Sequence, residues 1–255
     1  MSATVETVLR GYSLDSDEGD LGFAAVNLVT TTDAAGAPRR ILFDTGHVGR
    51  RGALLRALLD LGLTTNDIDV VVLSHAHWDH MQNADLFPYA AVLVHAHEVT
   101  YADSPGCDDL VTPSWTGALL RNLGVQTVRD REPIGVGVRT LHLAGHTAGS
   151  IGLTVETRDG LHILTGDAVA SAASLRRRRC SVVHHDEDRA TASVELVAAV
   201  ADVVWPGHDR PFAVVDGRPD EYLDTRVPLE FHLGARTPSA QDIALGPVRE
   251  ETAHA

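Results

Sequence analysis

Seven consecutive residues after a short apolar run constrain this chain more than any other feature. The run Asp69–Leu73 has the composition of a buried strand, and the segment that follows it reads Ser74-His75-Ala76-His77-Trp78-Asp79-His80. On a strand, His75 and His77 would point the same way because side chains alternate. A turn into a helix would then place Asp79 and His80 beside them. Burying so many imidazoles and carboxylates is costly without a compensating partner, and a cation is such a partner.

Three later segments each place one ligand-type residue beside glycine, directly after an apolar segment. They are Ala144-Gly145-His146-Thr147-Ala148-Gly149-Ser150, Leu164-Thr165-Gly166-Asp167 and Trp205-Pro206-Gly207-His208-Asp209. Glycine permits tight turns and a close approach of the backbone. The alternative is a set of polar loops whose histidines only form hydrogen bonds. That alternative explains a single histidine well, but it explains the Ser74–His80 segment poorly and the four segments together less well still, so the sequence predicts a metal site.

The order of apolar segments favours a layered α/β architecture. Period-two or short apolar runs predict strands at residues 22–31, 39–43, 69–73, 91–94, 136–143, 151–156, 161–165 and 202–205. Helices are predicted at residues 50–61, 96–102, 115–123 and 188–201. Turn residues at 33–38 and at Asp159-Gly160 predict two hairpins. The four polar segments all follow predicted strands, where a rigid sheet can hold loop residues in fixed positions.

This series of motifs resembles that of the metallo-β-lactamase superfamily. It comprises HxHxDH, GHTxGS, a strand that ends in Gly-Asp, and PGH, and the match runs from about Asp44 to His208. The resemblance implies an α/β fold, a four-layer αβ/βα sandwich with the metals at one edge between the sheets. It implies that the first metal is held by His75, His77 and His146. It implies that the second is held by Asp79, His80 and His208, with Asp167 bridging both.

The chemistry of such a centre follows from its charge. Two divalent cations about 3.5–4 Å apart can share a water and lower its pKa from about 15.7 towards about 7. The shared hydroxide then acts as a nucleophile without a separate protein base, so we expect a binuclear metal-dependent hydrolase. Asp79 is further expected to orient this hydroxide and to return a proton to the leaving group. Zinc is the default ion for imidazole and carboxylate ligands, with iron or manganese as alternatives.

Several residues beside the expected ligands are also candidates. Asp44, in an Asp-Thr-Gly segment, resembles a carboxylate that orients a metal-bound histidine, although a turn or cap is an equal alternative. Trp78, His184 and His185 are candidates for substrate contact, against core packing for the tryptophan and helix capping for the histidines.

A second HxH pair and a run of arginines are expected to be structural. His95 and His97 lack an Asp-His continuation, and a strand-to-helix turn followed by Glu98 explains them. The run Arg176–Arg179 suits a solvated surface better than a site for an anionic substrate, although arginine pairs well with carboxylate and phosphate.

Net charge and the two cysteines indicate which partners and which cellular location to expect. The net charge of −14 argues against nucleic-acid and anionic-membrane binding, since polyanions are repelled. Cys107 and Cys180 show no paired spacing, and no targeting signal or long apolar run is visible, so a soluble cytoplasmic protein is expected. A homodimer is left open. We expect one hydrolase domain over residues 1–220 and a partly irregular C-terminal extension over residues 221–255.

Differences between this sequence and known branches of the superfamily limit the reactions to be expected. True β-lactamases generally lack the bridging aspartate. Trp78 is similar to glyoxalase II enzymes, but their helical glutathione-binding extension is not evident. Acyl-homoserine-lactone lactonases carry a tyrosine three residues after the bridging aspartate, where this chain has Ala170. A lactonase-like or glyoxalase II-like hydrolase of a small ester, lactone or thioester is therefore expected. The alternatives are an iron-dependent redox enzyme similar to persulfide dioxygenases, and a phosphodiesterase.

Overall fold

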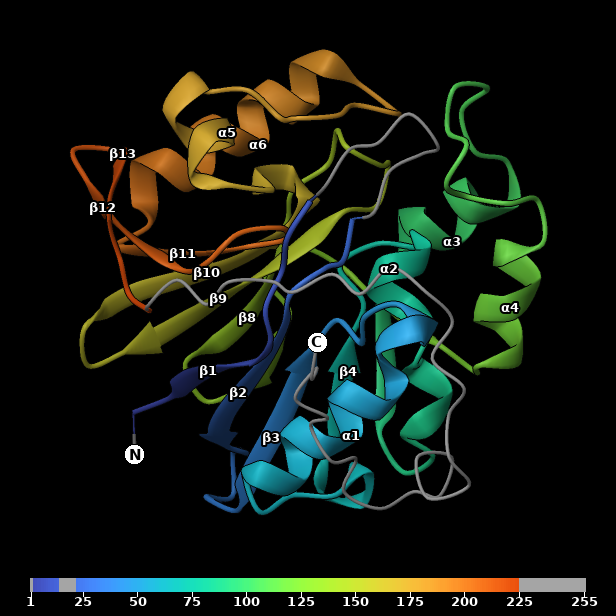
Figure 1. Ribbon diagram of the computed structural model, residues 1–255, viewed down its shortest axis with the longest axis vertical. Helices are drawn as coiled ribbons and strands as arrows, with labels where there is room; N and C mark the ends of the chain where they lie inside the picture. The colour runs from blue at the N-terminus through green and yellow to red at the C-terminus, as the bar shows by residue number, and fades with distance from the viewer. Residues whose placement is uncertain (1, 14–21, 225–255) are drawn as a thin grey trace, which may run out of the picture.

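Two mixed β-sheets form the centre of the molecule, whose computed structural model describes residues 2–13 and 22–224. The first sheet has the order β1-β2-β3-β4-β5-β6 and the second the order β13-β12-β11-β10-β9-β8-β7 (Figure 1). The strands of the first sheet are β1 (Thr4–Leu9), β2 (Val26–Thr32), β3 (Pro38–Phe43), β4 (Val70–Val72), β5 (Ala91–His95) and β6 (Gln126–Val128). The strands of the second are β7 (Pro133–Gly135), β8 (Val138–His142), β9 (Ile151–Thr157), β10 (Gly160–Gly166), β11 (Val203–Pro206), β12 (Phe212–Val215) and β13 (Arg218–Tyr222).

Helices cover the outer face of each sheet (Figure 1). The α-helices are α1 (Arg51–Asp60), α2 (Trp78–Met81), α3 (Ala96–Asp103), α4 (Thr116–Asn122), α5 (Ala172–Arg177) and α6 (Glu187–Val200). Short 3-10 helices are η1 (Val48–Arg50), η2 (Thr65–Asp67), η3 (Ala84–Leu86) and η4 (Asp167–Val169). The helices α1, α3 and α4 lie on the side of the first sheet, whereas α5 and α6 pack on the second.

Three apolar clusters separate these layers. Leu54 and Leu58 of α1 pack in the same cluster as Val71 of β4. The neighbouring Val70 and Val72 point to the opposite face and pack between the two sheets, because side chains alternate along a strand. Val194 of α6 belongs to a third cluster on the outer face of the second sheet. Helix, sheet, sheet and helix thus follow one another, which confirms the predicted αβ/βα sandwich.

Strand direction brings the loops of the site to one edge. β3, β4, β5 and β6 run parallel, so their carboxyl ends lie side by side. β10 and β11 are also parallel to each other. The chain therefore leaves β4, β10 and β11 through loops that carry the predicted ligands.

Several predicted boundaries were wrong. The strand predicted at residues 22–31 begins at Val26, and the one predicted at residues 136–143 begins at Val138, after a turn at Val136-Gly137. The missed elements are β1, β6, β7, α5, β12 and β13. Most of the predicted extension, residues 225–255, lies outside the described residues, whereas β13 continues the second sheet to Tyr222. No helix in the described part of the chain is long and apolar enough to span a bilayer.

Candidate metal centre

The histidine-rich segment leaves β4 and turns into α2, as predicted. His77 is the N-terminal cap residue of α2, with extended backbone angles, and Asp79 and His80 lie in the helix. His75 and His80 are fully buried, and His77 is 3% exposed. These buried imidazoles are thus fixed between the end of β4 and the start of α2.

The other three predicted ligands follow strands of the second sheet. His146 comes shortly after β8, Asp167 directly after β10, and His208 shortly after β11. Glycine is required beside Asp167, because a Cβ on Gly207 would lie 2.1 Å from Asp167 Oδ1. Gly166 has a positive φ of 51°, and a Cβ there would lie 2.7 Å from the Ser74 Cβ. These glycines let the two halves of the molecule come together at the site.

The structure brings all seven predicted ligands into two adjoining groups. One donor atom from each of the first group lies within 4.8 Å of the others, and this group comprises His75, His77, His146 and Asp167. The second group meets the same limit and comprises Asp79, His80 and His208.

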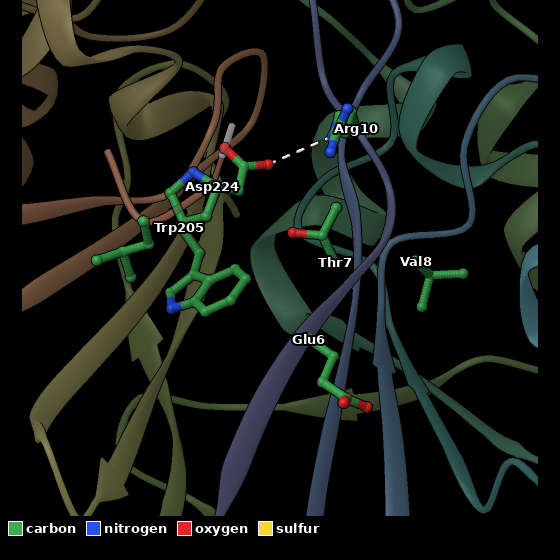
Figure 2. Close-up of a pocket in the computed structure, with 8 residues that line it drawn as sticks. Glu6, Thr7, Val8, Arg10, Trp205 and Asp224 are labelled. Atoms are coloured by element: carbon green, nitrogen blue, oxygen red, sulfur yellow. Dashed lines mark ion pairs between the residues drawn. The ribbon is translucent and has the colours of Figure 1, made fainter. Parts of the chain in front are cut away.

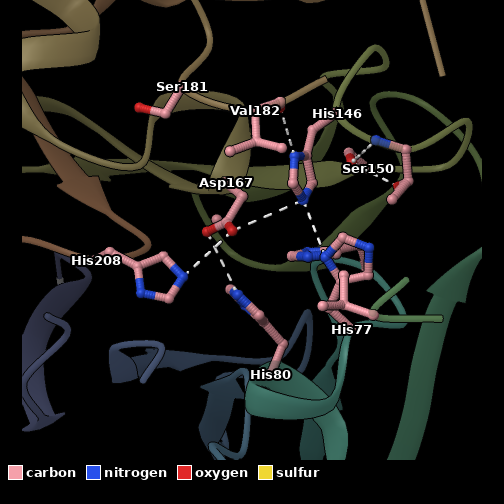
Figure 3. A network of polar contacts seen from close by, with 12 residues as sticks. His77, His80, His146, Ser150, Asp167, Ser181, Val182 and His208 are labelled. Carbon is pink, nitrogen blue, oxygen red and sulfur yellow. Dashed lines mark hydrogen bonds and ion pairs between the residues drawn. The ribbon is translucent and has the colours of Figure 1, made fainter. Parts of the chain in front are cut away.

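Asp167 lies between the two groups (Figure 3). Its Oδ1 is 3.3 Å from His80 Nε2, and its Oδ2 is 3.2 Å from His208 Nε2. The same Oδ2 is 3.7 Å from His146 Nε2, which belongs to the first group. One carboxylate therefore faces imidazoles from both sets, the position that a bridging ligand requires.

The unsatisfied atoms at this site match the donor chemistry of a metal. His75 Nε2, His80 Nε2 and Asp167 Oδ1 are buried and have no hydrogen-bond partner among the described residues. Buried polar atoms in folded proteins are nearly always hydrogen-bonded, so three adjacent exceptions need an explanation. All three are atom types that ligate zinc or a similar divalent cation. The residues present therefore fit a metal centre.

The electrostatics of the site also favour positive charge between the carboxylates. Burial opposes the charged form of His208, but Asp167 and Asp79 outweigh it and raise the pKa of His208 to about 9. At His146 burial dominates and lowers the pKa to about 3, so this imidazole is neutral and able to ligate. Burial opposes ionisation of Asp167, yet His208 and His80 hold its pKa well below the usual value.

Asp44 contacts His80, the arrangement expected of a carboxylate that orients a histidine ligand. Asp44 Oδ2 is 2.8 Å from His80 Nδ1, while the backbone N–H and the hydroxyl of Ser74 donate to the same carboxylate at 2.7 and 2.9 Å. Asp44 has a positive φ of 62°, uncommon for a residue with a side chain, and lies directly after β3. This contact leaves His80 Nε2 to face Asp167.

Backbone and hydroxyl oxygens orient three further histidines. His75 Nδ1 is 2.9 Å from the Ser74 hydroxyl, and His146 Nδ1 is 2.8 Å from the Val182 carbonyl oxygen. His208 Nδ1 is 3.2 Å from the Tyr12 carbonyl oxygen. In each case the contact occupies Nδ1, so Nε2 is the donor atom directed into the centre.

Asp109 was missed by the sequence reasoning and orients His77 in the opposite sense. Its Oδ2 lies 3.3 Å from His77 Nε2 and accepts the Tyr101 hydroxyl at 2.8 Å. His77 therefore directs Nδ1 inward, where it lies 3.1 Å from His146 Nε2. Asp109 lies in a polar loop, at no characteristic distance in sequence from the ligand motifs, so no local sequence pattern identifies it.

Glu98 was expected only as part of a turn, yet it joins two ligand loops. The carboxylate is fully buried, and its Oε1 accepts the Ala76 N–H at 2.8 Å. Its Oε2 accepts the Thr147 hydroxyl at 2.7 Å and the Gly149 N–H at 2.9 Å. Ala76 lies between two predicted ligands and Thr147 follows a third, so Glu98 fixes the two loops relative to each other.

The candidate substrate contacts differ in their distance from the ligands. The His184 ring lies 5.2 Å from that of His77 and 5.3 Å from that of His146, whereas the His185 ring lies 6.0 Å from Tyr101. Trp78 is 38% exposed and stacks on the exposed Trp115. The cap of α6 is Asp186, so neither histidine caps that helix.

Two other features lie apart from the predicted ligands. Within the Arg176–Arg179 run, Arg178 and Arg179 form ion pairs with Glu195 and Glu187 of α6, at 2.8 and 2.6 Å. A cavity of about 510 Å³ lies against β1, and none of the predicted ligands lines it (Figure 2). An ion pair of 3.3 Å between Arg10 and Asp224 crosses this cavity.

Comparisons with known proteins agree with this geometry. The family model described as Metallo-beta-lactamase superfamily matches residues 35–208. Metallo-beta-lactamase domain-containing protein 1 of Xenopus laevis is 32% identical over 213 residues, which cover 83% of this chain and 82% of that protein. An N-acyl homoserine lactonase of Agrobacterium fabrum is 32% identical over 171 residues, 60% of this chain and 61% of its own.

A solved structure supports the fold independently. An N-acyl homoserine lactone hydrolase with N-hexanoyl-L-homoserine at its catalytic metal centre superposes with a TM-score of 0.62 at 19% identity, and the match covers 82% of this chain and 94% of that one. The family match spans all the predicted ligand positions, from His75 to His208. The chain therefore belongs to the metallo-β-lactamase superfamily.

Proposed function

We propose that the protein is a binuclear metal-dependent hydrolase that cleaves a small ester, lactone or thioester. The observation that carries the proposal is the position of Asp167, whose carboxylate lies 3.2–3.7 Å from imidazole nitrogens of both ligand groups. A shared carboxylate of this kind suits a pair of divalent cations. The named activity of the Agrobacterium relative, an N-acyl homoserine lactonase, supports the reaction class.

The two groups of side chains would each hold one cation. His75, His77 and His146 would hold the first, Asp79, His80 and His208 the second, and Asp167 both. When bound, the cations supply Lewis acidity and a water of lowered pKa. Zinc is the ion that mixed imidazole and carboxylate donors favour, with iron or manganese as the alternatives.

Asp79 is the proposed carrier of the proton. Its Oδ2 lies 3.3 Å from His208 Nε2, and its side chain is 21% exposed, so it is more accessible than the buried histidines. In the proposed mechanism the Asp79 carboxylate accepts a hydrogen bond from the attacking solvent molecule and takes its proton as the new bond to the carbonyl carbon forms. It then passes that proton to the leaving oxygen or sulfur as the scissile bond breaks.

His184 and Trp78 supply the proposed substrate contacts. Burial lowers the pKa of His184 against the opposing effect of a hydrogen bond to the Asp108 backbone, and the ring lies beside those of His77 and His146. This ring would contact the substrate, in a chain that has Ala170 where lactonases have a tyrosine. The exposed face of Trp78 would contact an apolar part of the substrate.

Charge and thiol state support a small substrate and a reducing setting. The net charge of −14 opposes the approach of a polyanion, which makes a nucleic acid a poor substrate. Cys107 and Cys180 are both free thiols, which agrees with the cytoplasm as the proposed location.

A substrate panel combined with metal analysis tests the proposal. We expect about two zinc ions per chain in zinc-loaded protein. We also expect turnover of at least one lactone, ester or thioester, lost in Asp167→Asn and after chelation. Turnover of phosphodiesters alone would contradict the substrate class. One iron per chain with oxygen consumption would favour the iron-dependent redox alternative.

A further inference from the structure

A second group of histidines lies outside the seven residues proposed to hold the catalytic metals. His95 ends β5, His97 lies in the first turn of α3, and His142 ends β8. One ring nitrogen from each lies within 4.8 Å of the other two. The rings of His95 and His142 stack with centroids 4.0 Å apart, and the His97 ring is 4.9 Å from that of His95. Spacing along the chain joins only the first two, because His142 comes from the other sheet.

These imidazoles are in the state that binds a cation. Burial lowers the pKa of His95 to about 4, and the neighbouring His142 and His97 add to the effect. Burial also lowers the pKa of His142, so both rings are neutral at pH 7. Protons therefore do not compete with a metal for these two rings.

His97 and His142 each leave a donor atom available to a cation, whereas the His95 ring is buried beside them. His142 contacts the Ala148 carbonyl oxygen through Nε2 at 3.2 Å, which leaves the lone pair of Nδ1 available. His97 is exposed, and its ring lies against those of His95 and His142. The carboxylate of Asp130 accepts the backbone N–H of His142 at 2.8 Å and adds negative charge near this ring. Its effect on the pKa of His142 is larger than the opposite effect of Arg189.

We propose that His95, His97 and His142 bind one transition-metal cation of the zinc class, separate from the catalytic centre, with water completing its coordination. Zinc–nitrogen bonds of about 2.0–2.1 Å place tetrahedral ligand nitrogens about 3.4 Å apart, and the ring nitrogens here lie within 4.8 Å of one another. The stacked rings of His95 and His142 direct their in-plane lone pairs in parallel, so one of these rings has to turn for both to reach the same ion. If His95 coordinates through Nε2, its proton lies on Nδ1. His95 Nδ1 then no longer accepts the backbone N–H of His97, a contact of 3.2 Å in this structure.

Such an ion would tie the two halves of the molecule together. His95 and His97 flank the start of α3, on the side of the first sheet, whereas His142 belongs to the second. Glu98, next to His97, already joins ligand loops from both halves through hydrogen bonds. The additional ion would therefore reinforce the same junction beside the catalytic centre.

Zinc binding by full-length variants tests this site. Wild type, His97→Ala and His142→Ala are dialysed against buffers of fixed free Zn²⁺ and analysed for zinc per chain. We expect wild type to hold one more zinc than either variant, or to bind that ion at least about tenfold more tightly. The deciding quantity is the difference between variants, so the result does not depend on how many metals the catalytic centre holds.

A distant histidine provides the control. His47→Asn removes an imidazole but keeps an acceptor for the Gly49 N–H, and it should match wild type in zinc content. The added zinc should also raise the unfolding temperature of wild type and not that of His97→Ala. Equal zinc content and affinity in wild type, His97→Ala and His142→Ala would overturn the proposal.

Discussion

Single hydrogen bonds decide which nitrogen each histidine presents to the centre. Asp44 contacts Nδ1 of His80, whereas Asp109 contacts Nε2 of His77. The second contact reverses the ring, so His77 alone among the five histidines directs Nδ1 inward. Carboxylates in such positions fix the tautomer and raise the basicity of the ligand.

Removing the negative charge of Asp109 should weaken one metal position. In Asp109→Asn, the His77 ring loses its carboxylate partner, so we expect zinc affinity to fall about 10–100-fold. Competition with a coloured chelator measures the affinity. The neighbouring Asp108→Asn is the control, since Asp108 is exposed and should leave affinity unchanged. Equal affinities for the two variants would show that Asp109 does not position His77.

Asp79 should matter more for turnover than for metal content. Asp79→Asn keeps the size of the side chain and one oxygen donor, but it cannot accept and return a proton. We expect kcat to fall about 10²–10⁴-fold, the usual contribution of a positioned acid or base, while elemental analysis still finds most of the metal. An unchanged kcat on the best substrate would remove Asp79 from the mechanism.

At the scale of elements, apolar runs were good predictors and long-range neighbours were not. The strand after Asp69 was predicted because Val70–Val72 are buried on both faces of a parallel sheet. β13 (Arg218–Tyr222) was missed because its exposed, polar residues carry no period-two pattern. Asp109 and Glu98 reach the centre only through tertiary contacts. The candidate ligands could be recognised because four of them share one segment after a buried strand, while His146, Asp167 and His208 each follow a strand and stand beside a glycine.

Glu98 of α3 should stabilise the folded protein by holding the two ligand loops together. Glu98→Gln replaces one acceptor oxygen by an NH₂ group, which leaves a buried donor of Ala76, Thr147 or Gly149 without a partner. We expect the free energy of unfolding to fall by about 1–3 kcal/mol, measured with urea on metal-loaded protein. Glu156→Gln, at an exposed site, is the control. A fall of the same size in both variants would deny Glu98 this role.

At the scale of the whole molecule, the proposed centre joins the two sheets. Its residues come from the loop after β4 in the first sheet and from loops after β8, β10 and β11 in the second. A ligand that binds only the folded state stabilises it in proportion to the logarithm of its concentration relative to Kd. Metal bound here would therefore stabilise the association of the two halves and not merely one loop.

Metal removal should consequently lower stability, and more so at higher pH. At a free zinc concentration about 1,000 times Kd, the bound ion should add about 4 kcal/mol to the free energy of unfolding. The pKa of His208 is about 9 without metal, so at pH 7 zinc displaces a proton from this ring. Zinc affinity should then rise between pH 7 and pH 9 by up to about tenfold per pH unit for each proton displaced, and the stabilisation should rise with it. Urea unfolding with zinc or with chelator at several pH values measures both effects. The free energy of unfolding could be equal with zinc and with chelator, or the difference between them could shrink as pH rises. Either result would mean that the two sheets are not joined through a cation at Asp167 and His208.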